Sequence, residues 1–200
     1  MNSRIKTICV YASSSNNIDS KYFNEAYKLG VEIANNHYNI VYGGSNLGLM
    51  GEVTQAASNR GAEITGVMPE KLYNLGINPG NCSKFILTKE MRERKAKMDE
   101  LSQAVIALPG GFGTLEELSE MIVQKQLNYS NKPIVILNSF GFYDNLIKFF
   151  DDIINKNFAA NNSKSLYYEA KTPIEAVEYI NNYEFLSIDY LNKKIPLDKV

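Results

Sequence analysis

Short apolar runs alternate along most of the chain with segments whose apolar residues recur at helical spacing. The runs cover residues 5–12, 38–44, 62–69, 83–88, 104–111 and 132–138, and the helical segments cover 20–36, 49–60, 90–102, 113–127 and 142–155. This alternation is typical of βαβ units with right-handed crossovers. Because the runs ending at Tyr11, Gly43, Pro69 and Pro109 are almost wholly apolar, helices should cover both faces of their strands. The pattern predicts an α/β fold, a doubly wound parallel sheet with helices on both faces.

Two stretches fall outside this alternation. Segment 70–83 reads as a turn-rich loop, and the tail from about residue 183 has mixed polarity and continues no unit. The chain of 200 residues fits one domain, residues 1–200, with a sizeable core.

Composition narrows the classes of partner. The formal net charge is -1 and the pI is near 5.9, so the chain lacks the overall basic charge of a nucleic-acid binder. No apolar stretch reaches the roughly 20 residues of a membrane span, so we expect no membrane partner. Cys9 and Cys82 form no CxxC pair, which favours buried thiols in a reducing compartment. We therefore expect a cytoplasmic protein.

Glycine and serine gather where three predicted strands end. These joins are "YASSSNN" from Tyr11, "YGGSNLGLMGE" from Tyr42 and "LPGGFGTLEE" from Leu108. In an open parallel sheet, ligands bind outside the carboxyl ends of the strands, where loops meet helix N-termini. Unpaired amides and a partial positive charge make such helix ends suitable for phosphate. Solvated loops and plain turn chemistry remain the alternatives for the first two joins.

The third join allows two interpretations. The amides around Gly110, Gly111 and Gly113, with the Thr114 hydroxyl, could cradle one phosphate. Alternatively, Thr114 and Glu117 form a T-x-x-E capping box at the start of a helix, and spacing alone favours this second interpretation. In either case Glu117 would lie near a helix N-terminus, whose dipole should keep it ionised. The join has neither the spacing of a dinucleotide-binding fingerprint nor the Gly-Lys-Ser/Thr of a P-loop.

The charged segment 90–100, "EMRERKAKMDE", precedes the strand that leads into this third join. Charge runs of this kind are usually solvated helix faces. Its N-terminal end can nevertheless lie beside the ligand loops, where the Arg94 guanidinium would suit a phosphate. His37 is the single histidine and reads as a surface residue near a helix end. The sequence shows no metal-binding cluster, and we expect no metal and no cofactor.

Three stretches together resemble the Lonely Guy (LOG) family. "PGGFGTLEE" at 109–117 matches PGGxGTxxE, and it is accompanied by "MRERKAKM" at 91–98 and "YGGSNLGLMG" at 42–51. The resemblance runs from "ICVYASSS" to about residue 158. It implies a Rossmann-like fold, a homodimer, and hydrolysis of the N-glycosidic bond of an adenine-type nucleoside 5'-monophosphate, such as AMP or a cytokinin nucleotide. The products would be the free base and ribose 5-phosphate.

By position, the resemblance implies that Arg94 and Glu117 are catalytic. A carboxylate beside the ribose is chemically reasonable, because cleavage passes through an oxocarbenium-like state that carries positive charge. The neighbouring Glu116 is expected to be a solvated acid. The candidate substrate-binding residues are Ser13, Gly43, Gly44, Met91, Lys95, Pro109, Gly110, Gly111, Gly113 and Thr114. Whether the base is adenine or an N6-prenylated adenine stays open.

Two other functions were weighed against hydrolysis. The family's older "lysine decarboxylase-like" label is disfavoured, because no lysine has the setting of a pyridoxal phosphate Schiff base. A non-catalytic carrier of a nucleotide or cofactor is the stronger rival, since fold does not fix function. A carrier needs the glycine turn but not both Arg94 and Glu117. The apolar stripe of helix 115–127, which includes Leu115, Leu118, Met121 and Ile122, fits burial within the domain or a homodimer interface.

Overall fold

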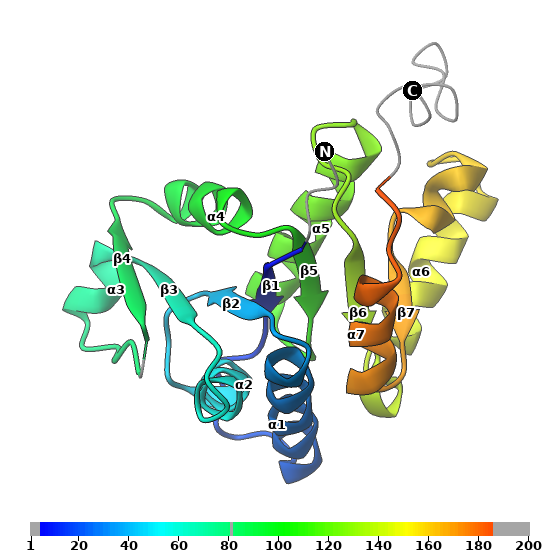
Figure 1. The fold of residues 1–200 in the computed structure, drawn as a ribbon. Helices are drawn as coiled ribbons and strands as arrows, with labels where there is room; N and C mark the ends of the chain where they lie inside the picture. Colours follow the sequence, from blue (N-terminus) through cyan, green and yellow to red (C-terminus); the bar gives the residue numbers. More distant parts are fainter. Residues whose placement is uncertain (1–4, 81, 186–200) are drawn as a thin grey trace.

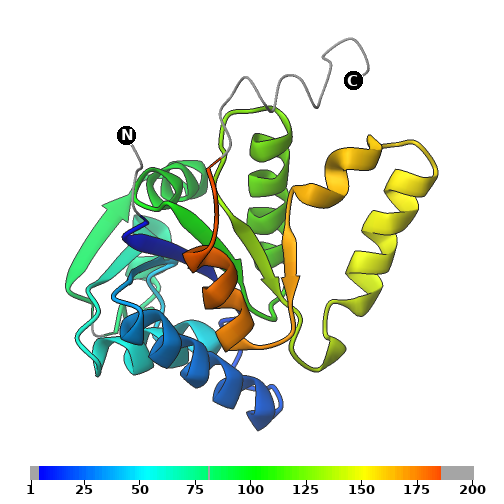
Figure 2. The same ribbon diagram turned by 45° about the vertical axis from the view of Figure 1, so that its right-hand side comes forward.

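The computed structural model describes residues 5–80 and 82–185, and it contains a seven-stranded parallel sheet (Figures 1 and 2). The strands are β1 (Thr7–Tyr11), β2 (Asn39–Tyr42), β3 (Ile64–Pro69), β4 (Lys84–Thr88), β5 (Ala104–Ala107), β6 (Ile134–Leu137) and β7 (Tyr168–Ala170). The helices are α1 (Ser20–Asn35), α2 (Gly48–Ser58), α3 (Glu70–Asn74), α4 (Met91–Glu100), α5 (Phe112–Gln126), α6 (Asp144–Asn155) and α7 (Pro173–Asn181). Two short 3₁₀ turns, Ser139–Gly141 and Asn161–Ser165, complete the described elements.

The order of strands places a switch point at the centre of the sheet. The order is β4-β3-β2-β1-β5-β6-β7, and every neighbouring pair is parallel. The chain therefore builds outward from β1 to β4, returns, and builds in the other direction from β5 to β7. Loops diverge where the direction reverses, so the carboxyl ends of β1 and β5 open a crevice.

Helices cover both faces, as the apolar strands predict. One face packs against α1, α2 and α7 through side chains such as Leu29, Val53 and Val177. The other packs against α4, α5 and α6 through Met98, Leu118 and partly buried Phe150. The α/β class and the doubly wound sheet are confirmed, as are the strands and helices predicted up to residue 155.

Two parts of the chain differ from the expectation. The predicted loop 70–83 contains the five-residue helix α3, none of whose residues is buried. Beyond residue 155 the chain adds β7 and α7, which the pattern did not predict. The α7 start has a Thr172 side chain that accepts from the Glu175 amide, with Pro173 at the first helical position. Most of the tail from residue 183 lies outside the described residues.

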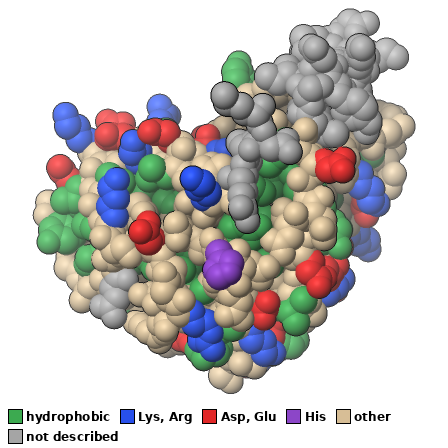
Figure 3. Space-filling view, in the orientation of Figure 1, with side chains coloured by type: hydrophobic (Ala, Val, Ile, Leu, Met, Phe, Trp, Pro, Cys, Tyr) green, Lys and Arg blue, Asp and Glu red, His purple; other side chains and the backbone are tan. Residues whose placement is uncertain are grey.

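The surface of the described part carries both signs of charge. On the face drawn in Figure 3, lysine and arginine are interspersed with aspartate and glutamate. His37 is exposed and follows the end of α1, as predicted (Figure 3). None of the helices in residues 5–80 and 82–185 is long and apolar enough to cross a membrane.

Lys125, in the last turn of α5, is buried without a carboxylate partner among the described residues. It is 4% exposed, and its ammonium lies 5.1 Å from the centre of the Tyr183 ring. Burial lowers the pKa of Lys125 to about 8. In the folded protein the charged form is therefore disfavoured, and this penalty is present below that pKa and fades as the pH rises toward the ordinary value of 10.5.

We expect Lys125→Met to raise the free energy of unfolding at pH 7 by on the order of 1 to 3 kcal/mol, because it removes a buried, unpaired charge. The gain should shrink at about pH 9.5, where the wild-type amine is mostly neutral in the fold. Urea unfolding at both pH values measures the effect. Lys148→Met, at an exposed position of α6, is the control and should change little. A destabilised Lys125→Met protein at pH 7 would contradict the prediction.

Candidate active site

The three glycine- and serine-rich joins meet at one edge of the sheet, as predicted, and enclose a pocket of about 460 Å³. The pocket is lined by Ala12, Ser13, Ser14, Ser15, Gly43, Ser45, Leu47, Met50, Met68, Leu72, Ile77, Arg94, Gly111, Phe112, Gly113, Thr114 and Glu117. It lies at the carboxyl ends of β1, β2 and β5, beside the switch point. Two other hollows in the described part, of about 520 and 1130 Å³, are lined by none of the predicted site residues.

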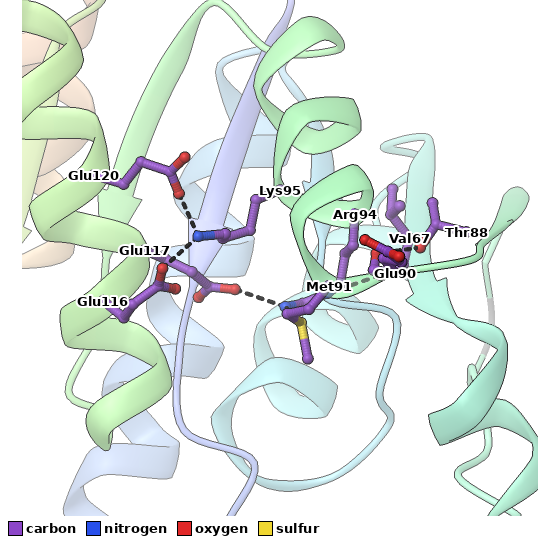
Figure 4. A network of polar contacts seen from close by, with 9 residues as sticks. All are labelled: Val67, Thr88, Glu90, Met91, Arg94, Lys95, Glu116, Glu117 and Glu120. Carbon is purple, nitrogen blue, oxygen red and sulfur yellow. Dashed lines mark hydrogen bonds and ion pairs between the residues drawn. The ribbon is translucent and has the colours of Figure 1, made fainter.

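Arg94 reaches this pocket from α4 and is held from three directions (Figure 4). Its Nε donates to the Val67 carbonyl at 3.2 Å, and its Nη1 donates to Glu117 Oε1 at 2.8 Å and to the Met91 sulfur at 3.3 Å. The residue is only 9% exposed. A guanidinium fixed in this way has a defined orientation. At Arg94, α4 therefore presents an oriented positive charge to the pocket, and the interpretation of the whole charged segment as a solvated helix face does not hold.

Gly43, at the end of β2, makes room for the guanidinium. A Cβ atom added at this position would lie 2.0 Å from Arg94 Nη2. Such a distance is far below any van der Waals contact, so a side chain at position 43 would displace the arginine. The glycine is therefore explained by the close approach of Arg94, and no positive φ is needed to account for it.

Glu117 faces Arg94 from the second turn of α5. Its side chain is 9% exposed and its ion pair with Arg94 measures 2.8 Å. Burial raises the pKa of Glu117 above its ordinary value, and the adjacent Arg94 acts in the opposite direction. The carboxylate lies beyond the first turn of α5, where the influence of the helix dipole is weak, so the ionisation of Glu117 at neutral pH stays a prediction. The ion pair with Arg94 favours the charged form of Glu117.

The capping-box interpretation of Thr114 and Glu117 is wrong. The N-cap of α5 is Gly111 and the helix begins at Phe112, so Thr114 is the third helical residue and Glu117 the sixth. The described residues provide no side-chain cap for this helix. Thr114 is 4% exposed, and a Cβ at Gly110 would lie 2.1 Å from its hydroxyl oxygen. The T-x-x-E spacing here brings a hydroxyl and a carboxylate into the pocket.

The N-terminus of α5 is open toward the pocket. No described residue accepts a hydrogen bond from the amides of Phe112, Gly113 or Thr114, and the first helical bond runs from the Leu115 amide to Gly111. These unpaired amides and the helix dipole form a site suited to an anion. By contrast, the start of α2 is occupied, because its Gly48 and Met50 amides donate to Asn16 Oδ1 and to the Ser13 carbonyl.

Five of the predicted binding residues are not among those that line the pocket. Lys95 points from α4 to α5, where its ammonium pairs with Glu116 and with Glu120, the latter at 2.6 Å (Figure 4). Glu116 is exposed, as expected, but it has this partner. The other four contact residues that line the pocket. The Met91 sulfur accepts from Arg94, and the Pro109 carbonyl accepts from the Ser13 amide. Gly110 lies directly against Thr114, and Gly44 lies against Met68.

Comparisons with known proteins bear on this site. A family model described as "Possible lysine decarboxylase" matches residues 50–180. The cytokinin riboside 5'-monophosphate phosphoribohydrolase LOG of Oryza sativa subsp. japonica is 38% identical over 186 residues, which cover 91% of this chain and 77% of the relative. The cytokinin riboside 5'-monophosphate phosphoribohydrolase LOG7 of Arabidopsis thaliana is 36% identical over 198 residues, which cover 99% of this chain and 91% of the relative. The chain belongs to the LOG family.

Solved structures share the fold of this LOG family member. The molybdenum cofactor binding protein from Rippkaea orientalis has a TM-score of 0.67 and 25% sequence identity, covering 90% of this chain and 98% of that one. The molybdenum cofactor carrier protein from Chlamydomonas reinhardtii has a TM-score of 0.66 at 22% identity, covering 89% and 97%. At 22% identity, the similarity to the Chlamydomonas reinhardtii protein is evidence for the fold alone.

One wall of the LOG-family pocket was not predicted from the sequence. It is apolar, and it consists of Leu47, Met50, Met68, Leu72 and Ile77. Leu72 and Ile77 belong to the segment that read as a turn-rich loop, where no periodicity marks an inward-facing residue. Phe112, 91% exposed at the first position of α5, also lines the pocket. Within the described residues, no group of three or more His, Cys, Asp or Glu side chains could hold a metal ion.

We expect the acidic limb of kcat/KM against pH to lie above 4.5, the ordinary pKa of a glutamic acid, because burial raises the pKa of Glu117. Activity should fall as the pH decreases through this limb and the carboxylate becomes protonated. A pH–rate profile with a nucleoside 5'-monophosphate measures the limb in the free LOG-family enzyme. A limb at or below 4.5 would contradict the assignment to Glu117.

Proposed function

We propose that this chain hydrolyses the N-glycosidic bond of an adenine-type nucleoside 5'-monophosphate to the free base and ribose 5-phosphate. The observation that carries the proposal is the buried Arg94–Glu117 pair, which faces the open N-terminus of α5 across one pocket. The named activity of the similar LOG enzymes, cytokinin riboside 5'-monophosphate phosphoribohydrolase, supports the same reaction.

We infer a position for each part of the substrate in the pocket. The 5'-phosphate binds the amides of Phe112, Gly113 and Thr114, where the helix dipole favours an anion. The base lies against the apolar wall, and the ribose lies between them, near Glu117. As the glycosidic bond breaks, positive charge develops on the ribose, and the Glu117 carboxylate stabilises it. Arg94 fixes that carboxylate and opposes its protonation.

A chromatographic assay tests the proposal directly. Purified protein is incubated with AMP, with isopentenyladenosine monophosphate and with the two corresponding ribosides, and release of the free base is followed. We expect base release from at least one monophosphate. Binding of the monophosphates without release of base would support the carrier interpretation instead. The ratio of the two rates establishes whether the N6-prenyl group is preferred.

We also propose a cytoplasmic homodimer. Cys9 and Cys82 are free thiols, which suits a reducing compartment. On α5, Leu118 and Met121 are buried inside the subunit, whereas Val123 and Leu127 remain 49% and 42% exposed. An apolar groove of about 190 Å³ runs beside Val123 between α5 and α6. An exposed apolar face of this kind is suited to a subunit contact.

Light scattering at micromolar concentration should give about twice the 22.5 kDa chain mass. Val123→Glu introduces a charge into the α5–α6 face and should produce the monomer. Ile174→Glu, at an exposed position of α7 on the other side of the sheet, is the matched control and should leave the dimer intact. A wild-type mass of one chain would refute the homodimer.

A further inference from the structure

Among the described residues that line the pocket, Glu117 is the single side chain that can gain or lose a proton near neutral pH. Among its lining residues only Arg94 and Glu117 are ionisable, and an arginine does not deprotonate in proteins. Glycosidases that activate water directly use two carboxylates, one as acid and one as base. The described lining provides one carboxylate, so it does not supply a separate acid and base. Glu117 is therefore the candidate to react with the ribose directly.

The two oxygens of this carboxylate differ in their surroundings. Oε1 accepts from Arg94 Nη1 at 2.8 Å, and Arg94 is itself held by the Val67 carbonyl at 3.2 Å. No described residue donates a hydrogen bond to Oε2, and no dashed line reaches it in Figure 4. The carboxylate is thus fixed through one oxygen and presents the other to the pocket. A fixed carboxylate with one free oxygen is suited to covalent attack on a sugar carbon.

The pocket also separates the parts of the substrate that stay from the part that leaves. The phosphate end lies at the N-terminus of α5, whereas the base end is walled partly by Leu72 of α3 and by Ile77. No residue of α3 is buried, so this wall is a surface segment. A base can therefore leave and another can enter while the phosphoribosyl group remains anchored at α5.

We propose that this protein is also a phosphoribosyl transferase, exchanging one adenine-type base for another through an ester between Glu117 and C1' of the ribose. The proposal rests on the proposed hydrolysis. Glu117 Oε2 attacks C1' from the α face as the C1'–N9 bond breaks, and the departing base takes the electron pair and then a proton from solvent. The N9 atom of an incoming base attacks C1' from the β face. The ester bond breaks, the carboxylate is restored, and the N9 proton passes to solvent.

The test is incubation of the wild-type protein with unlabelled AMP and isotopically labelled adenine. We expect label to appear in AMP while AMP is being hydrolysed. Added methanol should also be captured, as methyl ribofuranoside 5-phosphate. Ribose 5-phosphate interconverts between its anomers in water, whereas a methyl glycoside does not. The configuration at C1' of the methyl product therefore records how it was formed. Two inversions at C1' predict the β anomer, which NMR identifies.

Controls separate exchange from other routes. Labelled adenine with ribose 5-phosphate in place of AMP should give no labelled nucleotide, because the proposed route starts from the nucleotide. Glu117→Gln should lose both exchange and hydrolysis by on the order of 10² or more, whereas Glu120→Gln, on the same helix outside the pocket, should keep both. Absence of label from AMP, equal labelling from ribose 5-phosphate, or the α anomer of the methyl riboside would each overturn the transfer. Absence of free base from every monophosphate would instead contradict the proposed hydrolysis.

Discussion

Glu117→Gln should lower kcat by on the order of 10² or more, since among the described residues it removes the one carboxylate that lines the pocket. Glutamine preserves the size of the side chain and can still accept a hydrogen bond from Arg94. The variant should therefore fold and retain α5, and its circular dichroism and unfolding midpoint should stay near those of the wild type. Steady-state release of base from the best monophosphate measures the loss.

Two companion variants make this result specific. Arg94→Lys keeps the positive charge but loses the planar fork that contacts Val67, Met91 and Glu117 together, so we expect a comparable loss of activity. Glu120→Gln alters a carboxylate on the same helix that pairs with Lys95 at the surface, and it should stay close to wild type. Wild-type turnover in Glu117→Gln would show that the hydrolase mechanism is wrong and would favour the carrier.

Removing the 5'-phosphate should have the second large effect. The amides of Phe112, Gly113 and Thr114 have no acceptor among the described residues, so a nucleoside leaves them without the anion that the site accommodates. Each missing contact costs roughly 1 to 3 kcal/mol. Two or three such contacts predict that kcat/KM for adenosine falls below that for AMP by on the order of 10² to 10⁴.

Thr114→Val provides a structural check on that prediction. It removes one hydroxyl from the phosphate site and leaves the backbone amides in place, so kcat/KM for AMP should fall by about tenfold. Cleavage of adenosine, which has no phosphate to bind, should not respond. Equal rates for adenosine and AMP in the wild type would remove the phosphate role from the α5 N-terminus.

The centre of the sheet was predictable from one strong rule. Strands that helices cover on both faces are apolar throughout. That rule located β1, β2, β3 and β5, whereas β4 and β6 were predicted from the alternation of short apolar runs with helical segments. It could not locate β7, which has only three residues, or α3, which has no buried face to impose periodicity. The apolar wall formed by Leu72 and Ile77 was missed for the same reason: two inward-facing residues in an irregular segment leave no pattern.

The surroundings of Glu117 illustrate what spacing alone cannot decide. The T-x-x-E pattern occurs twice, at Thr172–Glu175 and at Thr114–Glu117. In the first, threonine is the N-cap of α7, and the Glu175 side chain accepts from the Lys171 amide. In the second, α5 starts three residues earlier than a Thr114 cap would require, and the same pattern places a hydroxyl and a carboxylate in the pocket. Where a helix starts depends on the preceding turn, and here Gly111 takes the cap position.

Arg94 and Lys95 are consecutive on α4, and Glu116 and Glu117 are consecutive on α5. The two helices are therefore joined twice, by a buried pair inside the pocket and by a surface pair that Glu120 reinforces. Substitution of Lys95 removes both surface pairs and is expected to alter the separation of Arg94 and Glu117, whereas Glu120→Gln leaves the Lys95–Glu116 pair in place. Lys95 is therefore a position at which protein engineering can vary the Arg94–Glu117 geometry without changing a residue that lines the pocket.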